Sequence, residues 1–165
     1  MKRLAAVLAA IACLGAAPEP QGVALETLLA EAPAPKLADY RLFKDVAGRT
    51  PNAGLTPYTL NTPLFSDYAE KFRLLYLPPG TKAKYRNEGA FDFPIGATLV
   101  KTFAYPADLR RPDHDIRYLE TRLLIRKREG WVALAYVWNA EQTEAVLKRA
   151  GTRLDANFID AKGQA

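Results

Sequence analysis

Polar and aromatic residues are crowded together in NTPLFSDYAEKFRLLYLPPG, residues 61–80, a composition typical of ligand sites. Asn61, Ser66, Asp67 and Tyr68 can offer hydrogen bonds and a stacking ring to a small ligand. The same residues also suit a turn at Ser66-Asp67 that leads into a strand. Both interpretations stay open, and we take these four as candidate ligand-binding residues.

Four carboxylates near these rings raise the alternative of a carboxylate-based hydrolase: Asp67, Glu70, Glu88 and Asp92. A glycosidase needs two carboxyl groups roughly 5 to 9.5 Å apart across a cleft, which spacing along the chain does not establish. Asp67 is typical of a turn, and Glu70 is expected to face outward at the start of a strand. We therefore expect no catalytic residues and a protein that is not an enzyme.

The only histidine, His114, lies in the loop-like segment RRPDHDIRY. Together with Asp113 and Asp115 it can offer a weak site for a divalent cation. Three adjacent side chains in an extended loop rarely converge on one ion, so we expect no metal site. The sequence also lacks a P-loop, a GxGxxG fingerprint and an HExxH motif.

Three large rings lie close together near the end of the chain: Trp131, Tyr136 and Trp138. They can form a sugar-stacking platform, and Trp138 is the ring that we keep as a candidate ligand residue. Strand alternation, however, places Trp138 and Tyr136 on one face and Trp131 on the other. Rings on a central strand more often belong to the core.

Basic residues exceed acidic ones, with a net charge of +5, and many of them gather between residues 110 and 128. A nucleic-acid interface needs such bases on one face, interleaved with stacking aromatic rings. We expect a solvated strand face instead, and no nucleic-acid partner.

The first 17 residues have the layout of a secretory signal peptide. Lys2 and Arg3 precede an apolar run from Leu4 to Ala17 that ends in small residues. That run is shorter than the roughly 20 residues needed to span a bilayer, so no membrane span is expected. The alternative is a lipid anchor on Cys13, the only cysteine, because AIAC loosely resembles a lipobox. We expect a periplasmic or secreted protein, or one that is lipid-anchored at the envelope.

The rest of the chain predicts one β-rich domain. Residues 18–36 are rich in proline and alanine and indicate a linker, in which 23–30 is compatible with a short helix. A second short helical pattern spans 37–43, and 48–63 is expected to be a loop. Residues 37–165 are expected to form a mainly β, antiparallel, sandwich-like domain with one or two short N-terminal helices.

Alternating apolar residues predict the individual strands, at 71–77, 97–104 and 118–138. The last range is a hairpin that reverses at Glu129-Gly130, and its second strand is expected to be central because it is apolar on both faces. Turns are expected at Pro79-Gly80, at 160–163, and as a type I turn with Pro94 in second position. Residues 145–147 favour a strand, and 154–158 alternate again.

Three ordered segments resemble the N-terminal region of a family of bacterial exported diheme c-type cytochromes, which are otherwise largely uncharacterised. The segments are LNTPLFSDYAEKFRLLYLPPGTKAKY, FDFPIGATLVKTFAYPADL and ETRLLIRKREGWVALAYVWNAEQTEAVL. The resemblance implies an electron carrier with haem c attached through CxxCH motifs downstream. This chain contains no CxxCH motif, so haem is implied only for a missing downstream region, and no cofactor is expected here.

The resemblance therefore implies a non-catalytic extracytoplasmic accessory domain that supports electron transfer by docking or scaffolding. Its partner would be a cytochrome domain or another redox protein. The alternative is an envelope module that binds a glycan or a small ligand through the loop around Asn61 to Tyr68.

Overall fold

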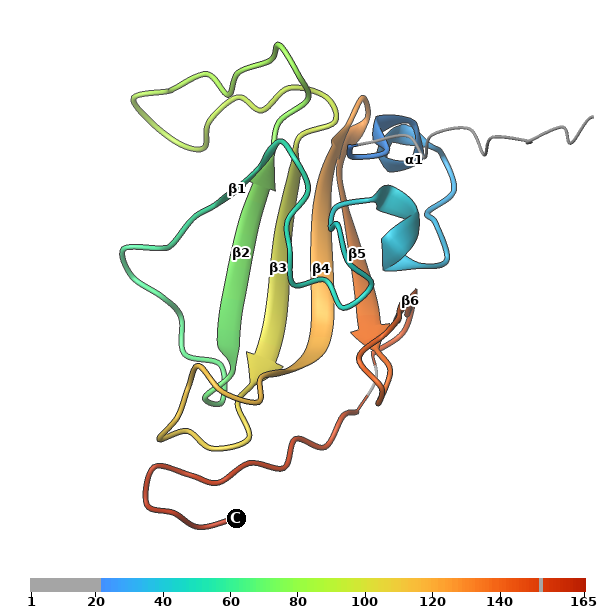
Figure 1. Ribbon diagram of the computed structural model, residues 1–165. Coiled ribbons are helices and arrows are strands. Elements are labelled where there is room, and N and C mark those ends of the chain that lie inside the picture. Colours follow the sequence, from blue (N-terminus) through green and yellow to red (C-terminus); the bar gives the residue numbers. More distant parts are fainter. Residues whose placement is uncertain (1–21, 152) are drawn as a thin grey trace, which may run out of the picture.

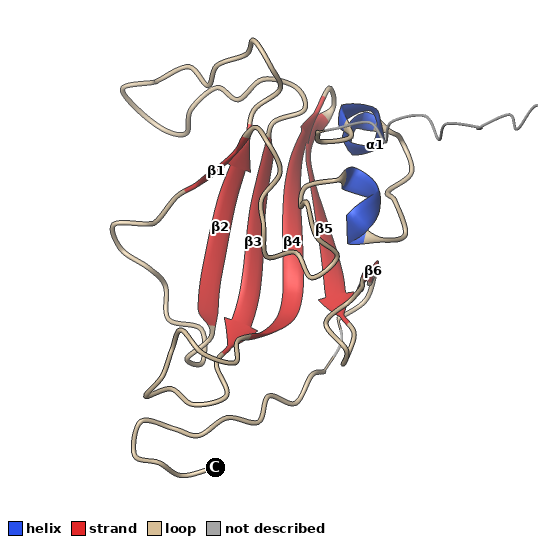
Figure 2. Ribbon diagram, in the orientation of Figure 1, coloured by secondary structure: helices blue, strands red, loops and turns tan. Residues whose placement is uncertain are grey.

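The computed structural model describes residues 22–151 and 153–165, and its strands form one antiparallel sheet (Figure 1). A short helix and a 3-10 turn come first, and six strands follow (Figure 2). The elements are α1 (Leu25–Leu29), η1 (Leu37–Tyr40), β1 (Leu55–Pro57), β2 (Glu70–Tyr76), β3 (Thr98–Tyr105), β4 (Arg117–Lys127), β5 (Gly130–Trp138) and β6 (Ala145–Leu147). The sheet order follows the sequence, from β1 to β6.

The expected mainly β, antiparallel fold with short N-terminal helical segments is confirmed. The described strands all belong to one open sheet, so the second layer of the predicted sandwich is not a second sheet. It consists of α1, η1 and the loop of residues 41–54. In Figure 1 this loop crosses in front of β3 and β4, while α1 and η1 lie beside β5.

Side chains alternate between the two faces of the sheet, as the sequence pattern predicts. In β3, Thr98, Val100, Thr102 and Ala104 are buried, and the residues between them are half-buried. The buried set lies under the helical layer, and we call this side the covered face. The other side, which includes Leu99, Lys101 and Phe103, is the open face.

The N-terminal segment packs on the covered face as part of the core. Leu28 and Leu37 are almost fully buried there, and α1 is the helix predicted within 23–30. The described part of the predicted linker, from Gly22 onward, is thus integrated in the domain. Gly96 allows this contact, because a Cβ atom there would lie 2.6 Å from Leu25 Cδ1.

Two buried hydrogen-bond networks fix the core: the first joins the helical layer to the sheet, and the second joins β4 to β5. The Tyr40 and Tyr136 hydroxyls lie 2.8 Å apart, and Tyr136 donates to the Ala34 carbonyl at 2.9 Å. On the same face, Trp138 Nε1 donates to Thr121 Oγ1 at 2.9 Å. Such satisfied polar groups fix one arrangement of the core, because leaving any of them unpaired costs free energy.

Three details of the strands differ from the sequence predictions. A bulge in the β3–β4 pairing lets Tyr118 join the covered face, whereas simple alternation along 118–138 would place Leu119 there with Thr121, Leu123 and Ile125. The predicted loop 48–63 contains the short edge strand β1. Residues 153–158 form no strand, and Ile159 makes only an isolated parallel bridge to Asp108.

The turn before β3 is shifted by one residue from its predicted position. The Ala97 N–H donates to the Pro94 carbonyl, so Pro94 takes the first position of the turn and Gly96 the third. The φ of +88° at Gly96 is that of a type II turn, not the type I turn that was expected. The turn at Pro79-Gly80 has the predicted form, with a Thr81 N–H to Pro78 carbonyl bond.

The position of β5 in the sheet is also less central than predicted. β5 pairs with β4 along its length, but β6 covers only its last three residues, Tyr136 to Trp138. The beginning of β5 therefore lies at the sheet edge, where Trp131 is 42% exposed.

Among the described residues, no helix has the length and apolar character needed to cross a membrane. The predicted signal peptide (1–17) and the candidate lipidation residue Cys13 lie outside the described residues.

Candidate docking face and predicted ligand residues

A row of three cations crosses the open face of the sheet. Arg73 of β2 pairs directly with Lys101 of β3, and Lys101 pairs directly with Arg122 of β4. Directly opposed side chains in an antiparallel pair have Cβ atoms about 5 Å apart, and like charges there destabilise the sheet. We call Arg73, Lys101 and Arg122 the cation row.

The electrostatic environment of the row reflects this crowding. Partial burial lowers the pKa of Lys101, and the neighbouring charges of Arg73 and Arg122 lower this pKa further. Glu120 counters part of the effect and forms an ion pair with Arg122. Within the described part of the chain, no carboxylate forms an ion pair with Arg73 or Lys101. The row therefore retains a net positive charge.

Apolar side chains flank the cation row on both sides. Towards one end of the strands, Leu75, Leu99 and Leu124 form the next row across the same three strands. Towards the other end lies Phe103, whose ring centroid is 4.4 Å from Lys101 Nζ and 4.9 Å from the Arg122 guanidinium carbon. The face thus combines positive charge with apolar area, a combination found where proteins bind partners.

A hollow of about 780 Å³ adjoins the row at the start of β2. The loop before β2 forms one wall with Ser66 and Tyr68, and the C-terminal segment forms another with Phe158. Lys71, Arg73 and Lys162 line it together with Glu70 and Asp160, so its charges are mixed, and Arg73 joins it to the cation row. Phe158 is fixed by stacking on Tyr105, with 5.0 Å between the ring centroids.

Two of the five predicted ligand residues, Ser66 and Tyr68, line this hollow, and Asp67 lies between them in the turn without lining it. Ser66, Asp67 and Tyr68 form a tight turn closed by a 2.8 Å bond from the Ala69 N–H to the Ser66 carbonyl. Asp67 and Tyr68 have φ values of +45° and +65°, and the Asp67 carbonyl accepts a 2.6 Å bond from the Tyr105 hydroxyl. The predicted turn at Ser66-Asp67 is therefore present, and its strained backbone is held from β3.

The other two predicted ligand residues lie elsewhere. Asn61 is exposed in the loop before the turn and does not line the hollow. Trp138 lies on the covered face beside Tyr136, as the alternation predicts, and is 7% exposed. No common site of Trp138 with Ser66 and Tyr68 is therefore formed. Trp131 is on the open face, as alternation predicts, so the alternative of a three-ring platform is not formed either.

Trp138 forms part of a second hollow, of about 540 Å³, on the covered face. Arg41, Asp45 and Glu144 also line this hollow, so its charges are mixed. Burial raises the pKa of the Asp45 carboxyl, but hydrogen bonds from the Arg49 and Thr50 backbone outweigh that effect and leave the pKa lowered. The Asp45 carboxylate therefore stabilises the loop to which it belongs, through hydrogen bonds from residues 49 and 50.

The carboxylates of the hydrolase alternative are not gathered in one cleft. Asp67 and Glu70 lie at the start of β2, whereas Glu88 and Asp92 lie in the loop that follows its other end. A seven-residue strand is about 23 Å long, well beyond the separation that glycosidases use. Asp92 is instead paired with Arg86 at 3.1 Å.

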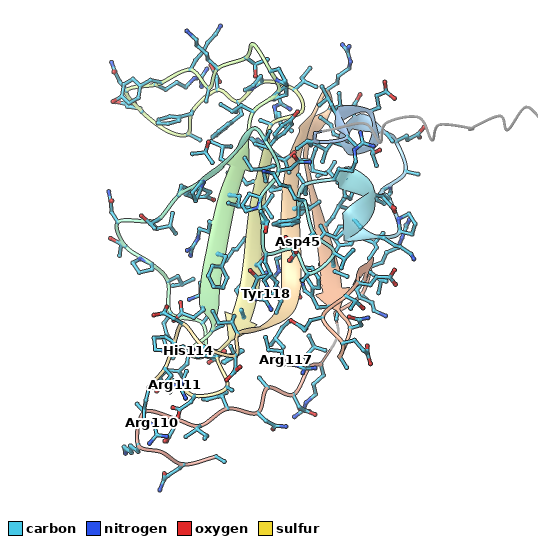
Figure 3. The ribbon with its side chains drawn as sticks, viewed as in Figure 1. Asp45, Arg110, Arg111, His114, Arg117 and Tyr118 are labelled. Carbon is cyan, nitrogen blue, oxygen red and sulfur yellow. The ribbon has the colours of Figure 1, made fainter. Side chains whose placement is uncertain are left out.

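His114 lies in an exposed loop at the lower end of the sheet in Figure 3, beside Arg111 and away from Asp45. Its backbone N–H donates to the Arg111 carbonyl at 3.1 Å, which closes a turn. Over the described ranges, no three metal-binding side chains are grouped as a cation would require.

Comparisons with known proteins identify no relative: no family model, no curated protein and no solved structure matches the chain. The arrangement of its own side chains must therefore support any functional conclusion. Sequence reasoning noted Arg122 but missed Arg73 and Lys101 as its neighbours, although each lies at an outward position of a predicted strand. Only the strand register reveals that the three form one row.

Proposed function

We propose that the chain is a non-catalytic docking domain, exported from the cytoplasm, that binds an acidic surface of a partner protein. The observation that supports this best is the cation row of Arg73, Lys101 and Arg122 on the open face. Opposed like charges weaken a sheet, and a partner that supplies carboxylates would relieve the repulsion. The resemblance of the sequence to exported diheme cytochromes suggests a cytochrome domain or another redox protein as that partner.

The flanking apolar rows give this surface a means of forming a stable complex. Surface charge mainly increases association rates and orients the partners, whereas burial of apolar side chains slows dissociation. Leu75, Leu99, Leu124 and Phe103 are only half-buried, so a partner seated on the cation row would cover them. In this proposal, haem c is held by the partner, and this domain positions it.

A second candidate function is a binding module for an envelope glycan or another small ligand. The hollow beside the Ser66–Tyr68 turn favours it, because hydroxyl groups, aromatic rings and cations line one concavity. Screening the protein on a glycan array distinguishes the two functions. The module hypothesis requires a bound glycan whose signal is lost in Tyr68→Ala. A protein that binds no glycan, but does bind acidic peptides, excludes it.

The docking proposal is tested with a fluorescent oligoglutamate peptide as the probe. The triple variant Arg73→Gln, Lys101→Gln, Arg122→Gln should bind the peptide at least about tenfold more weakly, a loss of ~1.4 kcal/mol. A matched variant, Lys44→Gln, Arg111→Gln, Arg153→Gln, removes three exposed charges outside the open face. Equal weakening of both variants would show that only the net charge matters, and would refute the proposal.

A further inference from the structure

Four aromatic rings form a continuous chain at the end of the sheet opposite the Ser66–Tyr68 turn. Ring centroids lie 5.8 Å apart for Tyr85 and Phe91, 6.3 Å for Phe91 and Phe93, and 5.6 Å for Phe93 and Trp131. Three of them belong to the loop of residues 81–95, which projects beyond β2 and β3 in Figure 1. We call these four residues the aromatic end.

The rings of the aromatic end are more exposed than core rings. Tyr85 is 73% exposed, Phe91 50% and Trp131 42%, and the nearby Ile95 is 41% exposed. Neighbouring apolar side chains with this much exposure on a monomer indicate a surface that binds something.

Basic residues surround these rings. The loop of residues 81–95 and the β4–β5 turn of residues 126–131 together contain six bases and three acids, a net charge of +3. One of the acids, Asp92, is already paired with Arg86. Lys82, Lys84 and Arg128 are exposed. A partner of this end would therefore be negatively charged as well as partly apolar.

We propose that the aromatic end contacts the surface of an anionic lipid bilayer. Tyr and Trp rings favour the headgroup region, where one part of the ring is apolar and another is wet. Basic residues near an anionic bilayer each add binding free energy, worth roughly a fivefold gain in affinity per base. A projecting loop that carries exposed rings and bases, next to Trp131, supplies both contributions.

This inference is independent of the docking proposal, because it uses neither the cation row nor the Ser66–Tyr68 hollow. The cation row lies further along the strands and is flanked by leucines. An anionic bilayer could also attract the cation row, so the test must separate the two surfaces.

The test uses the chain from Pro18, which contains every described residue, and vesicles of phosphatidylcholine with or without phosphatidylglycerol. The chain has two tryptophans, exposed Trp131 and buried Trp138. Bromine-labelled lipids should quench the fluorescence of Trp131 in anionic vesicles only. Trp131→Phe leaves Trp138 as the sole emitter, and that emission should be unaffected by the labelled lipids.

Two variants distinguish the surfaces in vesicle sedimentation. Tyr85→Ser with Phe91→Ser should lower the fraction bound at least about fivefold, and the triple cation-row variant should lower it no more than twofold. The proposal is overturned if neither vesicle type binds, or if the cation-row variant alone abolishes binding. It is also overturned if oligoglutamate, rather than lipid, protects Trp131 from a soluble quencher, since the aromatic end would then bind a protein.

Discussion

Gly48 determines how closely the loop over the covered face approaches Trp138. Its φ is +65°, and a Cβ atom would lie 2.7 Å from the Trp138 ring. The ring cannot move away easily, because its Nε1 donates a hydrogen bond to Thr121 and the ring makes a T-shaped contact with Tyr118. Both the backbone and the contact therefore require glycine here.

Gly48→Ala should lower the free energy of unfolding by about 3 kcal/mol, through backbone strain together with overpacking. Gly80→Ala is the matched control, because Gly80 has a φ of +75° but no atom within 4 Å of the added Cβ. It should cost only about 1 kcal/mol. Urea unfolding measures both values. If both variants lose the same free energy of unfolding, the close contact between Gly48 and Trp138 does not limit how the loop packs on the covered face.

Tyr136→Phe should destabilise the protein by about 1–3 kcal/mol, because it leaves the Ala34 carbonyl and the Tyr40 hydroxyl without their buried partner. Tyr85→Phe, at a ring that is 73% exposed, should change the stability by less than about 0.5 kcal/mol. Thermal unfolding at neutral pH compares the two variants. If Tyr136→Phe and Tyr85→Phe have the same Tm, the buried pair of hydroxyl groups does not contribute measurably to stability.

The same tyrosine gives a pH dependence with a definite sign. Burial, and then the hydrogen bond with Tyr40, raise the pKa of Tyr136 above its ordinary value of 10.0. The folded protein therefore retains this proton while the unfolded chain loses it. Stability is fully present below pH 10 and should fall above it, with a contribution of ~1.4 kcal/mol per pH unit from this group. In Tyr136→Phe, the free energy of unfolding should therefore fall less steeply with pH between pH 10 and 11. A pH dependence equal to that of the wild type would contradict the assignment of this effect to Tyr136.

At the scale of elements, the cation row is the feature in which the stability of the sheet and the proposed docking function oppose each other. Lys101 lies between Arg73 and Arg122 in direct register. Burial lowers the pKa of Lys101, and the two arginines lower it further. A sheet selected for stability alone would not place three cations in one row.

Lys101→Met should therefore stabilise the free domain by about 0.5 kcal/mol, since removing the repulsion from two arginines outweighs the loss of the contact between the ammonium group and the Phe103 ring. Added salt should stabilise the wild type more than this variant, because it screens the charges. Lys44→Met, on an exposed loop, should not alter the salt dependence. If added salt changes the free energy of unfolding equally in the wild type and in Lys101→Met, the proposed repulsion within the cation row is contradicted.

The strands β2 to β6, their faces and most turns could be predicted from the sequence, because alternation and turn residues act locally, whereas the short edge strand β1 was missed. The burial of Tyr136 and Trp138 on one face, with Trp131 on the other, followed from period two alone. The bulge that turns Tyr118 inward could not be predicted, since it depends on pairing with β3. Nor could the cation row, because single-strand patterns contain no information on register.

The candidate ligand residues show the same limit. Ser66, Asp67 and Tyr68 are neighbours in sequence, and their grouping in a turn was predictable. Their position beside Phe158 was not, because the C-terminal segment reaches them only through long-range contacts. Composition made Trp138 a candidate for the same site, yet it lies on the opposite face, where it is bonded to Thr121 of β4.

At the scale of the whole molecule, the sheet presents two differently built sides. The covered face is closed by α1, η1 and the loop of residues 41–54, and it contains the main core. The open face combines the cation row with half-buried leucines and Phe103, and the aromatic end lies beyond them. The core that stabilises the domain is thus on the covered face, and the surface that we propose for docking is on the open face.

The most direct measurement is an NMR titration of the labelled protein with an unlabelled oligoglutamate peptide. The account predicts shifts of the Arg73 and Arg122 side-chain signals and of the Lys101 ammonium region, which disappear at high salt and in the triple Gln variant. An oligolysine peptide should cause none of them. Shifts confined to the loop around Arg110 and Arg111, with an unchanged cation row, would contradict the claim that the open face is the docking surface.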